Sequence, residues 1–311
     1  MSVRKVIIPV AGLGTRLLPT TKALPKEMLP VGRYPAIQHV VEEMAAADLK
    51  KVLFVTSRSK TIIENQFDNN VDVVIHLEHN QRLQDLGDFD YSRRGIEFFY
   101  TRQQAPPGST KPQGTGAAVA AAESFVEDEH FVVAYGDTII DTVRTPNFIG
   151  RMMEAHTSHN ASCTVGVRPV PAELISSYGV VQPAAGESTT DRSFSIDDIL
   201  EKPDADSAPS NMAVSARYIF GPEIFDQIRK LKPADGGEIG ITDAIRGLIR
   251  EGRTVRAVSL KEDERRYDIG SHTSYYKAFI DFALRDPQCG EAVRAYLEAC
   301  VDSGGAPPPA D

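Results

Sequence analysis

Short apolar runs alternate with amphipathic segments in the first half of the chain, and this alternation limits the possible folds more than any other feature. The runs are rich in β-branched and aromatic residues and predict strands at 3–10, 51–57, 96–101, 130–137 and 161–170. Helical periodicity predicts helices between these strands, at 35–50, 60–67, 114–126 and 146–160. Strands that alternate with helices predict a parallel sheet with helices on both of its faces.

The pattern changes from Tyr178 onward. Extended pieces and helices are predicted at 178–183, 194–203, 212–220, 221–231, 241–252, 254–260, 267–270, 274–286 and 290–300. The expected fold class is therefore α/β, a Rossmann-like and mostly parallel mixed sheet flanked by helices, with a small extended region and C-terminal helices. We expect one domain over 1–300, with consecutive parts at 1–175, 176–270 and 271–300, and a tail over 301–311 that is disordered by composition.

Composition and charge disfavour several classes of protein. The 311 residues are 41% hydrophobic and 25% charged, which is ordinary for a globular chain. Cys163, Cys289 and Cys300 follow no metal-binding spacing and indicate free thiols in a reducing compartment. There is no signal-peptide pattern and no apolar run near the roughly 20 residues that span a membrane, so we expect a cytoplasmic protein without a membrane partner. The net charge of -9 argues against a nucleic-acid partner.

The loop after the first strand carries glycines and positive charge. In an open α/β sheet, ligands bind beyond the carboxyl ends of the strands, where "AGLGTR" lies. Gly12 and Gly14 let backbone N–H groups approach phosphate oxygens, and Arg16 and Lys26 add cations. Phosphate binding is one interpretation and a plain turn is the other. The loop lacks the third glycine of the dinucleotide fingerprint and the G-K-[ST] of a P-loop.

The longer string "GLGTRLLPTTKALPKEMLP" closely resembles the signature of the sugar-1-phosphate nucleotidylyltransferases, and among them those that use UTP and glucose 1-phosphate. Further matches in the same order are "YGVV" at 178–181, "EKP" at 201–203, "APSNMAVSARYIF" at 208–220 and "GEIGITDAI" at 237–245. The resemblance covers the chain from residue 6 to about residue 297.

The resemblance implies an enzyme that forms UDP-glucose and pyrophosphate from UTP and glucose 1-phosphate. Two polyanions meet at one phosphorus, so the chemistry requires charge neutralisation and in-line positioning more than acid–base catalysis. Residues 1–175 would bind mainly the nucleotide, and residues 176–270 mainly the sugar phosphate. The family is generally a homodimer or homotetramer. The aromatic residues of the last two predicted helices suit either packing within the chain or contact with a second copy, namely Tyr275, Tyr276, Phe279, Phe282 and Tyr296.

The nucleotide-binding residues that the resemblance implies lie in three segments. They are Ala11, Gly12, Gly14, Thr15, Gln103 and Gly114. Arg16 and Lys26 are the implied catalytic cations, which neutralise the departing pyrophosphate and the α-phosphate. The amide of Gln103 offers a donor and an acceptor to the uracil edge.

The metal and sugar-phosphate residues lie further along the chain. Asp137 follows a predicted strand and is the implied Mg²⁺ ligand, because Mg²⁺ favours one or two carboxylates plus phosphate oxygens. A capping aspartate is the alternative interpretation. Asp268 is the second implied ligand, which related thymidylyltransferases use but uridylyltransferases need not. The implied sugar-phosphate residues are Gly179, Glu201 and Lys202.

The sequence departs from the family pattern beside the predicted base site. The link between Gln103 and Gly114 is about six residues longer than usual. Ala117 stands in place of a usual histidine, "YGD" at 135–137 in place of "LPD", and Gly240 in place of a glutamine-like residue. The longer link predicts a lid over the nucleotide and leaves dTTP open as an alternative to UTP. The remaining alternatives are a catalytically silent regulatory paralogue, which should lose Arg16, Lys26 or Asp137, and a nucleotide-binding structural module.

Overall fold

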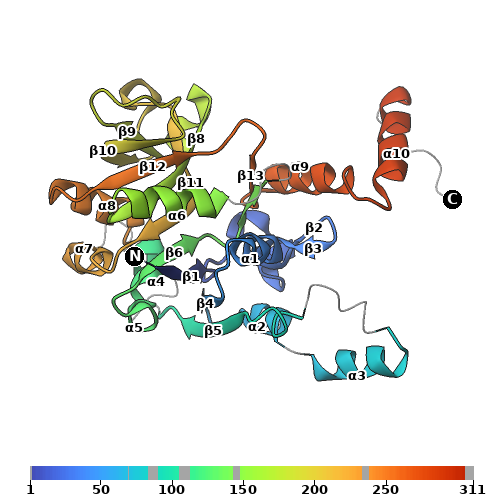
Figure 1. Cartoon of the computed structure of the whole chain (residues 1–311). Helices are drawn as coiled ribbons and strands as arrows, with labels where there is room; N and C mark the ends of the chain where they lie inside the picture. The colour runs from blue at the N-terminus through green and yellow to red at the C-terminus, as the bar shows by residue number, and fades with distance from the viewer. Residues whose placement is uncertain are drawn as a thin grey trace.

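The computed structural model describes residues 2–68, 70–82, 90–104, 113–142, 148–232 and 238–304. Within these ranges a nine-stranded sheet runs through the molecule in the order β5-β4-β1-β6-β11-β8-β12-β10-β9 (Figure 1). Its strands are β1 Val3–Pro9, β4 Lys51–Thr56, β5 Glu97–Arg102, β6 His130–Ala134, β8 Cys163–Pro169, β9 Gly179–Pro183, β10 Ser193–Glu201, β11 Met212–Phe220 and β12 Val255–Ser259. The predicted α/β class with a mixed sheet is confirmed.

The parallel part of the sheet joins β5, β4, β1 and β6, and a second parallel pair joins β8 and β12. β11 lies between β6 and β8 and is antiparallel to both. All nine residues of β11 are buried, as expected for a strand that is covered on both faces. The alternation of strands and helices did not predict this central antiparallel strand, because the partners of β11 are distant in the sequence.

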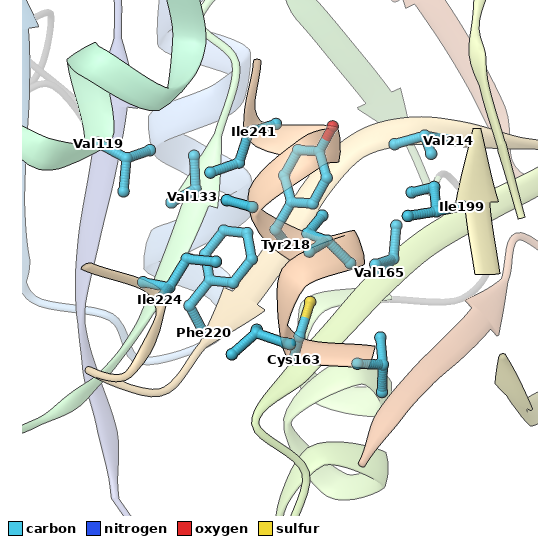
Figure 2. Close-up of a cluster of buried hydrophobic side chains, with 14 of the residues drawn as sticks. Val119, Val133, Cys163, Val165, Ile199, Val214, Tyr218, Phe220, Ile224 and Ile241 are labelled. Atoms are coloured by element: carbon cyan, nitrogen blue, oxygen red, sulfur yellow. The ribbon is translucent and has the colours of Figure 1, made fainter. Parts of the chain in front are cut away.

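Helices cover both faces because strand residues alternate between them. Ile7 of β1 packs with α4, α7 and α8, whereas Val6 and Ile8 pack on the opposite face with α1 and α6. Figure 2 shows the first of these two clusters, in which Val119 of α4 and Ile224 and Ile241 of the later helices point toward β6 and β11. The bounds of these helices are α1 Ala36–Ala46, α4 Gly114–Ala120, α6 Phe148–Ser158, α7 Ile224–Lys230 and α8 Ile241–Arg250.

The helical periodicity of the predicted helix at 35–50 places Ile37, Val40, Val41 and Met44 on one face of α1, and all four are fully buried. Further elements lie at the periphery of the sheet. They are α2 Thr61–Phe67, α3 Val71–His79, α5 Glu123–Val126 and the two-residue strands β2 Pro30–Val31 and β3 Tyr34–Pro35. The helix α3 was not predicted, and it buries none of its residues.

A small two-stranded sheet stands at the carboxyl edge of the large one. β7 Thr138–Asp141 pairs antiparallel with β13 Arg265–Asp268, and Asp268 is the register partner of Thr138. The predicted strand at 130–137 is therefore three residues too long, because β6 ends at Ala134 and the chain turns over residues 135–137 before β7 begins. Asp137 lies in that turn.

The helices α9 His272–Ala283 and α10 Gly290–Asp302 end the described chain and extend away from β9 and β10 (Figure 1). Phe282 packs within the chain, with its ring centroid 5.5 Å from that of Tyr267 and 4.8 Å from that of His39. Tyr276, Phe279 and Tyr296 are 57%, 40% and 49% exposed, so packing within the chain accounts for only part of this aromatic group.

Two further predictions concern the C-terminal tail and membrane-spanning segments. α10 continues to Asp302 and so enters the segment 301–311 that was predicted to be disordered, and residues 305–311 lie outside the described residues. Among the described residues, no helix combines the length and the apolar character that crossing a membrane requires.

Candidate active site

The loop after β1 begins with buried Ala11 and then becomes exposed at Gly12, Thr15 and Arg16. Gly14 has a φ of +67°, and its carbonyl oxygen accepts a hydrogen bond from the Thr21 hydroxyl at 2.8 Å. A Cβ atom at Gly12 would meet no atom of the described chain within 4 Å. Packing within the described chain therefore does not require glycine at position 12, and the open space beside it suits the approach of a ligand.

Lys26 lies beside this loop and forms an ion pair with Asp137. A Cβ atom at Gly14 would stand 3.6 Å from Cβ of Lys26. The Lys26 ammonium donates a short hydrogen bond to the Asp137 carboxylate, and both side chains are mostly buried. Burial opposes the charge of Lys26, but Asp137 and Glu27 outweigh it and raise the pKa of the ammonium. Burial likewise opposes the charge of Asp137, but Lys26 and Arg266 keep the pKa of its carboxyl below the usual value.

A buried ion pair fixes the backbone beside Lys26. Glu27 is the next residue of the same 3-10 helix, Lys26–Met28, and it is 2% exposed. Both carboxylate oxygens of Glu27 accept hydrogen bonds from Lys60, which follows β4. The sequence analysis did not single out either residue. Their pairing joins the loop that carries Lys26 to the tip of a neighbouring strand.

Asp137 and Asp268 face one hydroxyl group. The Thr138 Oγ1 atom lies 3.5 Å from Oδ1 of Asp137 and 3.5 Å from Oδ1 of Asp268. The pairing of β13 with β7 produces this arrangement, and the N–H of Ile269 also donates to the Asp137 carbonyl oxygen at 2.8 Å. Among the described residues, no group of three or more His, Cys, Asp or Glu side chains could hold a metal. Two adjacent carboxylates fit a cation whose remaining ligands are phosphate oxygens and water.

The side chain of Arg16 extends from the glycine loop to the neighbourhood of Asp268. Gly270 shows this proximity, because a Cβ atom there would lie 2.5 Å from Oδ2 of Asp268 and 3.4 Å from Nη2 of Arg16. The catalytic and metal residues that were predicted from the sequence therefore lie in one group at the edge of the sheet.

Gln103 and Gly114 lie together at the tip of the neighbouring strand β5. The Gln103 side-chain amide donates to the Gly114 carbonyl oxygen at 3.0 Å, and no described residue donates a hydrogen bond to the Gln103 side-chain oxygen. Gly114 has a φ of +89°, and a Cβ atom there would lie 2.8 Å from the Ile239 carbonyl oxygen, so the position requires glycine. Residues 105–112 of the longer link lie outside the described residues, and its lid function stays a prediction.

The residues predicted to bind the sugar phosphate form a second group. Glu201 accepts a hydrogen bond from the Thr242 hydroxyl at 2.7 Å, and a Cβ atom at Gly179 would lie 3.4 Å from the same carboxylate. Lys202 has a φ of +47°, its backbone N–H donates to the Tyr178 carbonyl oxygen, and its ammonium lies 3.7 Å from Glu201. In the described part of the chain, no hydrogen bond or ion pair joins Glu201 or Lys202 directly to Lys26, Asp137 or Asp268.

Arg168 and Arg266 lie between the two groups, and the sequence analysis missed both. Arg266 is two residues before Asp268 in one strand, so the period of two places both on one face. Arg168 is near the carboxyl end of β8, which is the sheet edge where ligands bind. The two-residue period of a strand could have identified Arg266, and its position at a strand's carboxyl end could have identified Arg168.

A family model for nucleotidyl transferases matches residues 5–284. The chain belongs to the nucleotidyl transferase family. This membership confirms the family and the enzyme class that the resemblance of "GLGTRLLPTTKALPKEMLP" implied, and it agrees with the fold class that the alternation of strands and helices predicted.

Similar proteins within this family share nearly the full length of the chain. The UTP–glucose-1-phosphate uridylyltransferase of Streptococcus pneumoniae serotype 4 is 38% identical over 297 residues, which cover 95% of each chain. The UTP–glucose-1-phosphate uridylyltransferase 2 of Streptococcus pyogenes serotype M1 is 37% identical over the same shares. Among solved structures, a UTP-bound UGPase from Acinetobacter baumannii matches with a TM-score of 0.85 and 32% identity, over 96% of this chain and 99% of that one.

Proposed function

We propose that this nucleotidyl transferase forms UDP-glucose and pyrophosphate from UTP and glucose 1-phosphate. Arg16, Lys26, Asp137 and Asp268 converge at one edge of the sheet, and this convergence carries the proposal. Nearly full-length similarity to uridylyltransferases and to a UTP-bound UGPase supports the choice of substrates.

The chain's own residues neutralise and orient two polyanions. Lys26 neutralises the α-phosphate of UTP, and Arg16 neutralises the β- and γ-phosphates. An oxygen of the sugar phosphate forms a bond to the α-phosphorus. The bond from that phosphorus to the bridging oxygen breaks in line, and pyrophosphate leaves with the electron pair. Gln103 with Gly114 reads the base, and Gly179, Glu201 and Lys202 bind the sugar phosphate.

Asp137 and Asp268 would hold a divalent cation, which we take to be Mg²⁺. The cation would supply charge neutralisation at the phosphate oxygens. Lys26 keeps Asp137 ionised, since it lowers the pKa of that carboxyl. The Thr138 hydroxyl oxygen lies 3.5 Å from one oxygen of each carboxylate and can donate its single proton to either of them.

The alternatives from the sequence differ in what they require. A silent regulatory paralogue should lose its catalytic charges, yet Arg16, Lys26 and Asp137 are present, and Lys26 contacts Asp137 directly. A thymidylyltransferase would use the same chemistry. It differs from a uridylyltransferase at the 5-methyl group of the base, where few contacts decide selectivity.

Product identification tests the proposal. Purified protein receives Mg²⁺, UTP and glucose 1-phosphate, and UDP-glucose is detected by mass spectrometry. We expect stoichiometric UDP-glucose and pyrophosphate, loss of both in excess EDTA, and loss of both in Lys26→Met. Lys22→Met is the matched control, because Lys22 is exposed and has no assigned role. Absence of UDP-glucose from folded wild-type protein would overturn the proposal.

Assembly into a homodimer or homotetramer is part of the same proposal. Tyr276, Phe279, Ile280 and Tyr296 of α9 and α10 leave apolar surface exposed, which is typical of contact surfaces. Light scattering should give a mass at least twice that of the 34.0 kDa chain, and a monomeric mass would contradict the assembly.

A further inference from the structure

Two arginines that no assigned role explains face the ring of one tyrosine. Arg168 belongs to β8, Arg266 belongs to β13, and Tyr178 immediately precedes β9. The guanidinium carbons of Arg168 and Arg266 lie 5.3 Å and 5.2 Å from the centroid of the Tyr178 ring. Both distances are within the range of a cation–π interaction. Three separate segments of the chain therefore converge on this ring.

Tyr178 connects the two groups of site residues. On one side, Nη2 of Arg266 lies 3.4 Å from Oδ1 of Asp268. On the other side, the Tyr178 carbonyl oxygen accepts a hydrogen bond from the N–H of Lys202 at 3.0 Å. The two guanidinium groups thus lie between a proposed metal ligand and a proposed sugar-phosphate residue. The phosphate of the sugar must occupy this region, because it links the sugar to the α-phosphorus that it attacks.

The charges around the ring are not balanced by the described chain. Arg266 is paired with Asp268, and its side chain is 7% exposed, whereas Arg168 forms no ion pair with any described residue. The Nε atoms of both arginines are shielded from solvent and lack a hydrogen-bond partner in the described ranges. Two like charges beside one ring repel each other, and a bound anion would relieve that repulsion. A guanidinium group with unused donors matches phosphate geometry.

We propose that the guanidinium group of Arg168 binds the phosphate of the sugar 1-phosphate, and that Tyr178 and Arg266 are positioning residues that hold it in place. This inference rests on the proposed function, because it names a further residue of the same sugar-phosphate site. The contact exists both before and during the reaction, so it acts mainly on substrate binding.

Steady-state kinetics of Arg168→Gln tests the inference. The KM for glucose 1-phosphate should rise about 10- to 100-fold, because a charge-assisted hydrogen bond to phosphate is lost. The KM for UTP and the kcat should stay within about twofold of wild type, as expected for the loss of uniform binding of one substrate. Arg168→Lys should recover part of the loss, and Arg192→Gln, at an exposed position before β10, is the matched control.

Two variants of Tyr178 test whether its ring holds Arg168 in place. Tyr178→Phe keeps the ring and should keep the KM for glucose 1-phosphate within about threefold of wild type. Tyr178→Leu removes the ring and should raise that KM about as much as Arg168→Gln does. Equal effects of Phe and Leu at position 178 would contradict the positioning role.

The outcomes separate this inference from the proposed function. Wild-type protein that forms no UDP-glucose would overturn both. An active wild type, with an unchanged KM for glucose 1-phosphate in Arg168→Gln, would overturn the inference alone. In the reverse reaction, Arg168→Gln could change only the KM for pyrophosphate. That result would assign Arg168 to the leaving group and would also overturn the inference. If Arg168→Gln does not fold, the KM for glucose 1-phosphate is compared between Arg168→Lys and wild type instead. A rise of at least about threefold in that KM supports the inference, and an unchanged KM overturns it.

Discussion

Lys60 Nζ lies 2.9 Å and 2.8 Å from the two carboxylate oxygens of Glu27, in an ion pair that is almost completely shielded from solvent. Burial raises the pKa of Glu27 and lowers the pKa of Lys60, because both charged forms lose hydration there. The hydrogen bonds from Lys60 to both carboxylate oxygens of Glu27 offset this loss of hydration. Since Glu27 adjoins Lys26, the pair also holds the ammonium of Lys26, which we propose to be catalytic, beside Asp137.

Lys60→Met should strongly destabilise the protein, because it leaves the Glu27 carboxyl buried without its partner. The expected loss is about 3–5 kcal/mol of unfolding free energy, measured by urea denaturation. The double variant Glu27→Leu/Lys60→Met should recover most of that stability. It should not recover activity, and we expect a kcat roughly 10- to 100-fold below wild type, because Lys26 loses its support. Full activity in the stable double variant would show that the pair does not position Lys26.

Gly12→Val should impair nucleotide binding without affecting the fold. The added side chain meets no described atom of the protein but would occupy space that we assign to the nucleotide. Crowding of about 1–3 kcal/mol would raise the KM for UTP roughly 10- to 100-fold. The thermal midpoint should match that of Ala185→Val, a substitution at an exposed turn. An unchanged KM for UTP would place the nucleotide elsewhere.

The sequence predicted which candidate residues lie together where these residues are close in the chain. Gly14, Arg16 and Lys26 lie in one continuous segment, and a strand before it fixes their location at the sheet edge. Asp137 and Asp268 were predicted from motifs, but their meeting at the Thr138 hydroxyl depends on β7 and β13. Each of these strands has four residues and no distinct periodic signal, so only tertiary pairing defines them.

Arg217 illustrates what the sequence could not show. The run "MAVSARYIF" predicted an extended segment correctly, but its burial was not predicted, and the run contains an arginine. The register of β11 breaks between Val214 and Tyr218, and Ala216 has a φ of +58°. This bulge directs Arg217 to Glu43 and to the Thr138 carbonyl oxygen, so a fully buried charge is paired beneath the turn that holds Asp137. The partners are distant in sequence, and no local pattern identifies them.

Acidic pH should destabilise the fold through His156. This side chain is fully buried, with Nε2 2.8 Å from Nδ1 of His130 and Nδ1 2.9 Å from the Thr164 hydroxyl oxygen. Burial, and then the charge of His130, lowers the pKa of His156 from 6.5 to about 3. Below pH 6.5 the unfolded chain binds a proton that the fold excludes, so this stability is complete above that pH and declines toward pH 3. At pH 5 the expected loss is about 2 kcal/mol.

Urea denaturation at pH 7.5 and pH 5 measures this effect. The wild type and the control His79→Gln, at an exposed position, should lose stability in parallel. His156→Gln should lose about 2 kcal/mol less between the two pH values, because it has no imidazole to protonate. An identical pH dependence in all three proteins would exclude His156 as the origin.

Gln103→Leu should weaken recognition of the base. The amide would no longer exchange hydrogen bonds with the imide edge of uracil, and the contact to the Gly114 carbonyl oxygen would be lost as well. We expect kcat/KM for UTP to fall about 10- to 100-fold. The exposed neighbour Gln104 provides the control variant Gln104→Leu. Equal kcat/KM values for Gln103→Leu and wild type would remove Gln103 from the base site.

Pyrophosphate release with different nucleotides tests the central claim most directly. Wild-type protein, Mg²⁺ and glucose 1-phosphate are combined in turn with UTP, dTTP, CTP, ATP and GTP. We predict release with UTP well above release with the other four nucleotides. Release that is highest with dTTP would contradict the choice of base, and no release with any nucleotide from folded protein would contradict the proposed catalysis itself.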